Sequence, residues 1–126
     1  MESLKVIKIG ALSGVLSVLF GAFGAHGLED LLFANGRIDT FETAVKYQFY
    51  HSLALLFIGI LMQTYQVKYL TWATNLFIFG IVMFSGSLYV LSLTNFTLLG
   101  AITPIGGLFF VFGWLALYKS TNSSAC

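Results

Sequence analysis

The sequence predicts an all-α protein, an integral membrane bundle of four transmembrane helices that forms one domain over residues 1–126. Only 9% of the 126 residues are charged, whereas soluble domains carry about 25% charged residues. Hydrophobic residues make up 58% of the chain, and its mean hydropathy is +0.90. Three long stretches contain no Asp, Glu, Lys or Arg, as expected of helices that cross the hydrocarbon core of a bilayer.

The uncharged stretches determine the number of spans. They cover residues 9–28, 47–67 and 69–118. The last holds 50 residues between Lys68 and Lys119 and would be about 75 Å long as one helix, whereas the hydrocarbon core is about 30 Å thick. It must therefore turn back once, and the polar residues 94–97 suit a turn. The apolar runs lack the alternation of barrel strands, and the predicted helical spans are 9–26, 44–66, 69–93 and 98–118.

The basic residues predict that both termini face the cytoplasm. Four spans place both ends of the chain on one side, which then carries Lys5, Lys8, Lys68 and Lys119. The other side carries Arg37 and Lys46, and the side richer in basic residues is normally the cytoplasmic one. The first span also resembles a signal peptide, since two lysines precede an apolar run that ends in small residues.

Small residues recur at helical spacing on two of the spans. On the first span they are Gly10, Gly14, Ser17, Gly21 and Gly24, whose spacing places them on one helical face. On the fourth span, two pairs lie seven residues apart, Gly100 with Gly107 and Gly106 with Gly113. Small residues let helices approach closely in lipid, where the hydrophobic effect does not drive association. We expect these faces to pack within the bundle; the alternative is contact with a second copy or a larger membrane complex.

Pro104 falls inside the predicted fourth span. A proline there cannot donate a hydrogen bond to the carbonyl group of Gly100, so a bend is expected. A bent helix can line a cavity, which makes a pore or facilitator for a small neutral solute one hypothesis for function. The uncharged stretches 9–28, 47–67 and 69–118 place no acidic residue, lysine or arginine at the depth of the membrane core, which argues against an ion-coupled carrier.

Two histidines, His26 and His51, lie within the uncharged stretches. His26 ends the first span, and His51 lies about two turns into the second, so both are expected near the outer surface. Gln48 and Tyr47 share a helical face with His51. The later spans are expected to bring further polar side chains to a similar depth: Ser85, Ser87, Tyr89 and Thr103. Hydrogen bonding between helices, and capping of the first helix by His26, are the structural interpretations of this cluster.

The same cluster supplies the candidate ligand-binding residues, which are His26, Gln48, His51, Tyr47 and Ser87. Two histidines on facing helices could ligate haem or a metal ion, and the group could also bind a quinone or a lipid headgroup. No cysteine or carboxylate within the spans completes a zinc site, and the chain has no nucleophile set or nucleotide-binding loop. We therefore expect neither enzymatic activity nor a cofactor.

The net charge of +1, without a basic patch, argues against a nucleic-acid partner and leaves membrane lipids as the expected surroundings. The absence of charges at depth and the small-residue faces favour an accessory or scaffold component as the leading functional hypothesis. Ligand or cofactor binding at the histidine pair is the alternative.

Four sequence blocks carry a resemblance to a known family. They are GAFGAHGL at 21–28, YQFYHSLAL at 47–55, FSGSLY at 84–89, and TPIGG at 103–107 followed by Gly113-Trp114. In these blocks the chain resembles the YgdD-like family of small inner-membrane proteins, known as domain of unknown function 423 and similar to animal transmembrane protein 256. The resemblance implies a four-span protein of the bacterial cytoplasmic membrane, but no activity. The turn around Asn95 departs from the family pattern, since a glycine is expected there.

Overall fold

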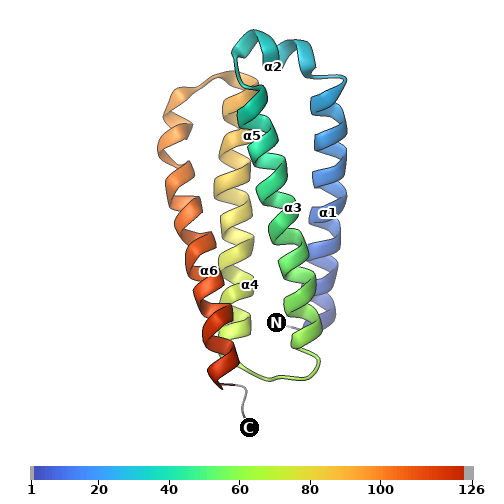
Figure 1. Ribbon diagram of the computed structural model, residues 1–126, viewed down its shortest axis with the longest axis vertical. Coiled ribbons are helices and arrows are strands. Elements are labelled where there is room, and N and C mark those ends of the chain that lie inside the picture. Colours follow the sequence, from blue (N-terminus) through green and yellow to red (C-terminus); the bar gives the residue numbers. More distant parts are fainter. Residues whose placement is uncertain (1, 124–126) are drawn as a thin grey trace.

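The computed structural model describes residues 2–123 and consists of helices (Figure 1). In chain order the elements are α1 (Ser3–Ala25), α2 (Glu29–Asn35), α3 (Ile38–Leu61), α4 (Lys68–Gly80), the π-helical segment η1 (Ile81–Ser85), α5 (Gly86–Thr94), the 3₁₀ segment η2 (Thr97–Ala101) and α6 (Thr103–Ser123). Because α4, η1 and α5 continue one another, residues 2–123 contain four helices long and apolar enough to cross a membrane. The prediction of a four-helix membrane protein is confirmed.

The two ends of the bundle carry different elements. The start of α1, the end of α6 and the α3–α4 connection lie at one end, which we call the terminal end (Figure 1). The short helix α2 and the α5–α6 connection lie at the opposite end, which we call the α2 end. The start of α1 and the end of α6 therefore lie on one side, as an even number of spans requires. That this side faces the cytoplasm stays a prediction.

The helices begin earlier than the predicted spans. The second span is predicted to begin at residue 44, although the capping pattern Asp39-Thr40-Phe41-Glu42 predicts a helix start near Thr40, close to Ile38 where α3 begins; α1 begins at Ser3 rather than at residue 9. The uncharged stretches mark the apolar part of each helix, whereas a helix can continue past it because charged side chains are tolerated at the interface. The extra turns of α3 change the depth of every polar residue on it.

The predicted bend at Pro104 is wrong. Residues 97–101 form the 3₁₀ segment η2, and α6 begins at Thr103, so Pro104 lies in the first turn of α6. A proline is tolerated there because the first N–H groups of a helix have no partner within it. The hydroxyl group of Thr103 instead donates to the carbonyl oxygen of Leu99 at 3.2 Å.

The α2 end is held by two turn residues and their contacts. Gly36 and Asn95 adopt the left-handed conformation, with φ of 66° and 56°. Asparagine tolerates this conformation better than most residues other than glycine, which explains how it replaces the expected glycine. The Asn95 side chain accepts a hydrogen bond from Nε of Arg37 at 3.0 Å, and Asn35 donates to the carbonyl oxygen of Ser92 at 2.9 Å. These bonds fasten α2 to the end of α5.

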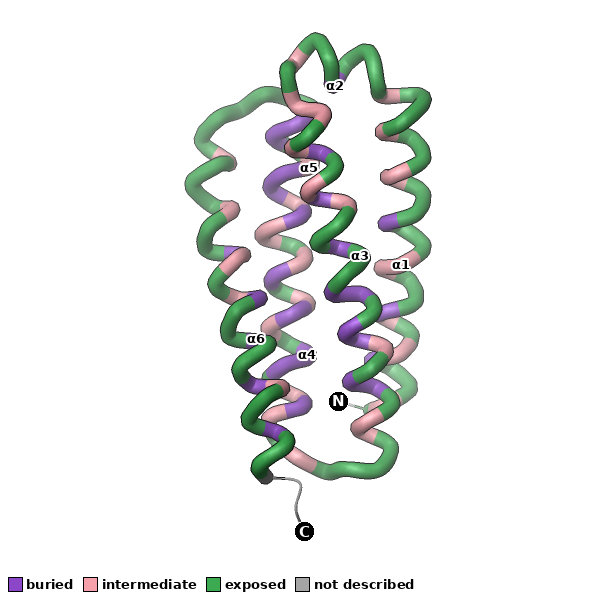
Figure 2. Tube along the Cα trace, in the orientation of Figure 1, coloured by how far each residue is buried: buried purple, intermediate pink, exposed green. Residues whose placement is uncertain are grey.

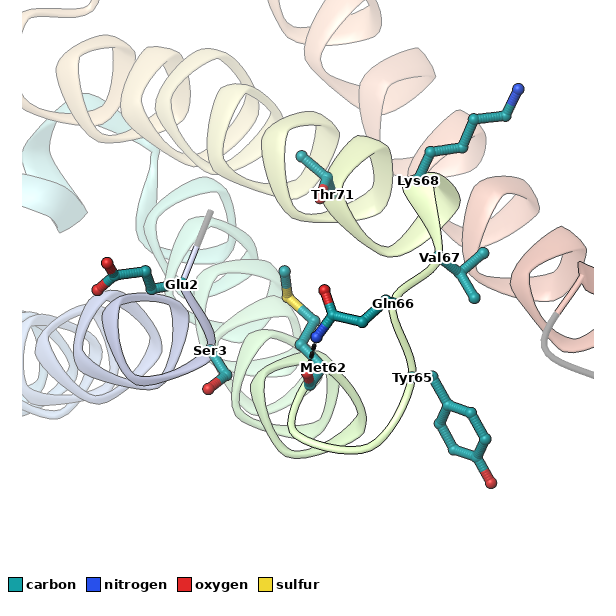
Figure 3. A pocket seen from close by; sticks show the side chains of 8 residues that line it. All are labelled: Glu2, Ser3, Met62, Tyr65, Gln66, Val67, Lys68 and Thr71. Atoms are coloured by element: carbon teal, nitrogen blue, oxygen red, sulfur yellow. Dashed lines mark hydrogen bonds between the residues drawn. The ribbon is translucent and has the colours of Figure 1, made fainter. Parts of the chain in front are cut away.

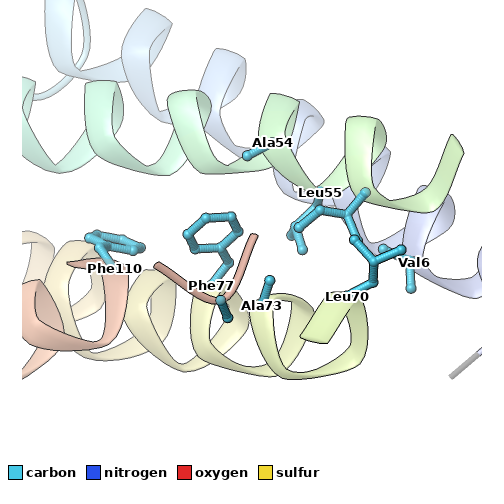
Figure 4. Close-up of a cluster of buried hydrophobic side chains, with 9 residues drawn as sticks. Val6, Ala54, Leu55, Leu70, Ala73, Phe77 and Phe110 are labelled. Carbon is cyan, nitrogen blue, oxygen red and sulfur yellow. The ribbon is translucent and has the colours of Figure 1, made fainter. Parts of the chain in front are cut away.

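The two central helices carry most of the buried residues. Figure 2 shows the buried positions concentrated on α3 and on the rod formed by α4, η1 and α5, whereas α1 and α6 are largely exposed. The exposed side chains of α1 and α6 are mostly apolar, as expected for surfaces that contact lipid. The largest buried apolar cluster lies between the helices (Figure 4) and contains Val6, Ala54, Leu55, Ile58, Leu70, Ala73, Phe77, Phe110 and Ala116.

The small-residue face of α1 packs against α3. A Cβ atom added to Gly10 would lie 3.0 Å from the carbonyl oxygen of Ser52, and one added to Gly24 would lie 2.5 Å from the ring of Phe41. Gly21 faces Val45 at 3.4 Å, and Ser17 is buried. Gly14 is the exception, because nothing lies within 4 Å of its Cβ position. The predicted packing within the bundle therefore holds for α1, apart from Gly14.

On α6, the closest approaches involve Gly106 and Gly113 rather than Gly100 and Gly107. A Cβ atom on Gly106 would overlap the backbone nitrogen of Phe84, and one on Gly113 would lie 2.5 Å from the ring of Phe77. Gly107 makes an ordinary contact with the Phe84 ring at 3.8 Å, and Gly100 has nothing within 4 Å. The prediction of a shared packing face for Gly100 and Gly107 is wrong, because Gly100 belongs to η2 and precedes α6.

Candidate functional site

A buried amide group connects three of the helices. Gln48 of α3 is 4% exposed, and its Nε2 atom donates to the carbonyl oxygen and to Oγ of Ser13 on α1, at 3.2 and 3.3 Å. Its Oε1 atom accepts a hydrogen bond from the hydroxyl group of Tyr89 on α5 at 2.6 Å. Ser52 adds to this network, since its Oγ atom lies 2.6 Å from Ser13 Oγ. Gln48 thereby fixes the position of the Tyr89 ring.

The Tyr89 ring forms a wall of an apolar pocket at the α2 end. It packs edge-on against Phe20 and Phe41, with ring centroids 5.0 and 5.1 Å apart. The pocket has a volume of about 420 Å³ and is lined by Phe20, Phe23, Gly27, Leu28, Phe41, Tyr89 and Leu93. Small-molecule sites commonly measure about 300–1,000 Å³ and are mostly apolar. Tyr89 supplies the one side-chain hydroxyl group of this lining, and that group already bonds Gln48.

Phe41 also lines a smaller pocket on the other side of the α1–α3 contact. That pocket has a volume of about 160 Å³, and its lining includes Leu32 of α2 together with Glu42 and Lys46 of α3. The Phe41 ring is buried against Gly24, so it is held between the two spaces. The two pockets differ in character, because only the smaller one includes charged side chains.

His51 lies in a separate, aromatic environment. Its Nδ1 atom is 2.6 Å from the carbonyl oxygen of Tyr47, and its Nε2 atom accepts a hydrogen bond from Trp114 Nε1 at 3.1 Å. The imidazole stacks on the ring of Phe110, with centroids 3.6 Å apart, and meets Phe77 edge-on at 5.1 Å. A carbonyl oxygen only accepts and an indole N–H only donates, so Nδ1 carries the proton of a neutral imidazole. Both nitrogens of the His51 ring therefore already form hydrogen bonds.

The structure does not bring His26 and His51 together. His26 occupies the C-cap position of α1, where its backbone N–H group bonds the carbonyl oxygen of Phe23, and its side chain is exposed. His51 lies 13 residues after the start of α3, about 20 Å along the helix axis. The early start of α3 explains the difference from the predicted depth. Among residues 2–123, no group of three or more His, Cys, Asp or Glu residues could hold a metal ion.

The remaining polar candidates form two further interhelical contacts. Ser87 of α5 lies 2.7 Å from Thr103 Oγ1 at the start of α6. Ser85 of η1 donates to the carbonyl oxygen of Ala44 on α3 at 2.8 Å. Tyr47 bonds His51 through its backbone, while its own ring packs against Phe84 with centroids 4.7 Å apart. The single cluster expected from the sequence is thus divided among several contacts.

Sequence reasoning missed Ser13, Ser52 and Trp114. Ser52 follows Gln48 by four residues and lies on the same helical face, so its spacing could have included it. Trp114 stands in the sequence as part of the Gly113-Trp114 block that carries the family resemblance. Its pairing with His51 depends on the vertical register of α6 against α3, which no local pattern specifies.

Comparison with known proteins identifies the family. The model of a family described as "Protein of unknown function (DUF423)" matches residues 20–107. The chain belongs to this family. A curated relative, the UPF0382 membrane protein of Staphylococcus epidermidis, is 51% identical over 115 residues, which cover 91% of this chain and 93% of the relative. The UPF0382 membrane protein YwdK of Bacillus subtilis is 42% identical over 112 residues, which cover 88% and 90%.

No solved structure matches the chain. The resemblance to domain of unknown function 423 is confirmed, and the relatives and the four apolar helices make this DUF423 protein a multi-pass bacterial membrane protein. The family description assigns no activity. Gln48, Tyr89 and the whole lining of the larger apolar pocket lie inside the segment that matches the family, whereas Trp114 lies beyond it.

Proposed function

We propose that this DUF423 protein is a non-enzymatic binding protein of the cytoplasmic membrane that takes the apolar chain of a membrane lipid between α1, α3 and α5. The observation that carries this proposal is the pocket of about 420 Å³ beside Tyr89. Its walls are aromatic rings and aliphatic side chains, which match a hydrocarbon chain in polarity.

The hydroxyl group of Tyr89 is already hydrogen-bonded to Gln48, which favours a hydrocarbon chain over a polar headgroup as the ligand. Its hydrogen bond to Gln48 leaves the pocket wall without a free side-chain donor. A quinone ring or a phosphate group would lose its hydrogen bonds to water without replacing them, at a cost that the pocket does not offset. A hydrocarbon chain forms no hydrogen bonds to water and therefore loses none when it enters the pocket.

Access and rigidity support the same proposal. Phe23 and Leu93 at the rim of the pocket are 58% and 38% exposed on the outside of the bundle, where lipid chains surround the protein. The Gln48 bonds to α1 and α5 hold the opposite wall in place before a ligand arrives. A preorganised wall lowers the entropy cost of binding.

A pocket-filling substitution tests this function. Leu93→Trp adds bulk at the rim, and Leu12→Trp makes the same change on the exposed face of α1 away from the pocket. Protein purified in a mild detergent is extracted with solvent, and the extracted lipids are quantified by mass spectrometry. We expect the wild-type chain and Leu12→Trp to retain the same lipid and Leu93→Trp to lose it. Equal retention by all three proteins would reject the proposal.

An accessory role in a larger membrane assembly is the second candidate function. Gly14 favours it, because this position of the small-residue face of α1 has nothing within 4 Å and stays open to a helix of another protein. Gly14→Leu should then abolish a crosslink that the wild-type chain forms in native membranes, while Leu12→Ala leaves it. A wild-type chain that forms no reproducible crosslink would remove this candidate.

A further inference from the structure

Two lysines from different helices share one aromatic ring at the terminal end. The ammonium group of Lys68, at the start of α4, lies 5.3 Å from the ring centroid of Tyr69 and 5.5 Å from that of Trp72. The ammonium group of Lys119, near the end of α6, lies 5.7 Å from the same Tyr69 ring. The Tyr69 and Trp72 rings meet edge-on, with centroids 5.2 Å apart. We call Lys68, Tyr69, Trp72 and Lys119 the lysine platform.

No acidic group neutralises the lysine platform within residues 2–123. Neither Lys68 nor Lys119 forms an ion pair with another described residue, and the first turn of α4 contains no acidic residue and has no side-chain cap. Glu2 is the one acidic residue at the terminal end, since the others lie on or near α2: Glu29, Asp30, Asp39 and Glu42. Among residues 2–123, the two cations and the positive end of the α4 dipole therefore lie together without a paired counter-charge.

The lysine platform faces outward rather than into the bundle. A pocket of about 630 Å³ at the terminal end is lined by Glu2, Ser3, Met62, Tyr65, Gln66, Val67, Lys68 and Thr71. Figure 3 shows the Lys68 side chain extending away from Glu2 and Met62, so its ammonium group does not enter that pocket. Trp72 is exposed on the outside of the bundle, at the level where interfacial aromatic residues meet lipid headgroups.

We propose that the lysine platform binds the headgroup of an anionic phospholipid in the leaflet at the terminal end. The phosphate of the headgroup would contact the two ammonium groups, while Tyr69 and Trp72 support the lysine stems and the upper part of the lipid chains. The site is independent of the apolar pocket, which lies at the α2 end of the molecule.

The charge complementarity singles out an anionic lipid rather than a neutral one. A zwitterionic headgroup brings its own cation to the phosphate and leaves the two lysines without a net counter-charge. The interfacial rings distinguish the lysine platform from the other lysines of this end, Lys5 and Lys8, which are exposed on α1 and contact no aromatic ring.

A pair of matched double variants tests the proposal. Lys68→Gln/Lys119→Gln removes both charges of the lysine platform, and Lys5→Gln/Lys8→Gln removes the same number of charges at the same end. The full chain in detergent is titrated with phosphatidylglycerol or phosphatidylcholine, and bound lipid is counted by native mass spectrometry. Far-ultraviolet circular dichroism checks that each variant keeps its helical content.

We expect the lysine-platform variant to bind phosphatidylglycerol about tenfold more weakly than the wild-type chain, because two lysines near a headgroup each contribute to attraction. The Lys5→Gln/Lys8→Gln variant should stay within about twofold of the wild type. Equal weakening in both variants would show a general effect of charge and overturn the assignment. Equal binding of phosphatidylcholine and phosphatidylglycerol by the wild-type chain would overturn it as well.

Discussion

The contact between α1 and α3 and the contact between α6 and the central rod use different chemistry. Between α1 and α3, Gln48 and Ser52 form hydrogen bonds with Ser13. Between α6 and the rod, glycines accept aromatic rings: the Phe77 ring lies against Gly113, and the Phe110 ring lies against Gly80. The α1–α3 contact thus adds hydrogen bonds to the close approach of Gly10 and Gly24, whereas the α4–α6 contact rests on the close fit of apolar surfaces.

The difference shows two ways of holding helices together where the hydrophobic effect does not help. Closely fitted apolar side chains fill the space between α4 and α6 and belong to the buried cluster around Phe77 (Figure 4). The polar contact keeps Gln48 and Tyr89 in place at the edge of a pocket that stays unfilled by the chain. Hydrogen bonds between α1, α3 and α5 therefore position the Tyr89 wall of this pocket.

The largest effect is expected where helices approach most closely. Gly106→Ala places a Cβ atom onto the backbone nitrogen of Phe84, which cannot move without disturbing η1. The loss of unfolding free energy should be about 3 kcal/mol, at the upper end of the usual cost of overpacking. Unfolding in sodium dodecyl sulfate, followed by circular dichroism, measures it. Gly100→Ala has open space and serves as the control; a similar loss there would contradict the packing.

A substitution in the polar contact should lower the free energy of unfolding less than Gly106→Ala does. Gln48→Leu leaves the hydroxyl group of Tyr89 without its partner, and an unsatisfied buried polar group costs about 1–3 kcal/mol. The same unfolding assay measures this loss, and lipid retention should fall as the Tyr89 wall loosens. Gln66→Leu, on the exposed α3–α4 connection, should be neutral. Wild-type stability and retention in Gln48→Leu would show that the network is dispensable.

The hydrogen bond between Trp114 and His51 should make a small contribution to the free energy of unfolding. Trp114→Phe keeps an aromatic ring but removes the indole N–H group that reaches His51 Nε2. Hydrogen bonds between membrane helices average about 0.6 kcal/mol, so the expected loss is of that size. Trp72→Phe removes the other indole ring and should leave the free energy of unfolding unchanged, because Trp72 is exposed. If the two variants unfold alike, the Trp114–His51 bond contributes nothing.

The smallest expected change in the free energy of unfolding is a stabilisation rather than a loss. Gly14→Ala meets open space and replaces a poor helix former with a good one, so it should stabilise α1 by about 0.5 kcal/mol. Gly10→Ala, on the same face, should destabilise the protein instead, because its Cβ atom would lie 3.0 Å from the carbonyl oxygen of Ser52. The two variants compared in one unfolding series should shift in opposite directions. A shift in the same direction would show that the face is not packed as described.

The number of spans could be predicted because it depends on length and charge alone. A stretch of 50 uncharged residues is too long for one crossing wherever its neighbours lie. The close packing of the α1 glycines within the bundle followed from spacing for the same reason, since a helical face is a local property, whereas the identity of the partner helix did not. The involvement of Gln48 and Tyr89 in one half of the bundle also followed from topology.

The grouping of side chains could not be predicted from the sequence because it depends on helix register. His51 lies 13 residues after the start of α3, deeper than the two turns expected within the span, and there it contacts Trp114 rather than His26. Pro104 illustrates a related limit, since the uncharged stretch did not show where η2 ends and α6 begins. The apolar pocket is a property of three packed helices and leaves no signature in any one of them.

Site-specific photocrosslinking tests directly whether a lipid chain occupies the space beside Tyr89. A photoreactive benzophenone side chain replaces Phe23 at the rim of the pocket or, as a control, Leu12 on the exposed face of α1. After irradiation of intact membranes, the account predicts a single lipid adduct at position 23 and a mixture of bulk lipids at position 12. An adduct to another protein at position 23, or the same mixture at both positions, would contradict it.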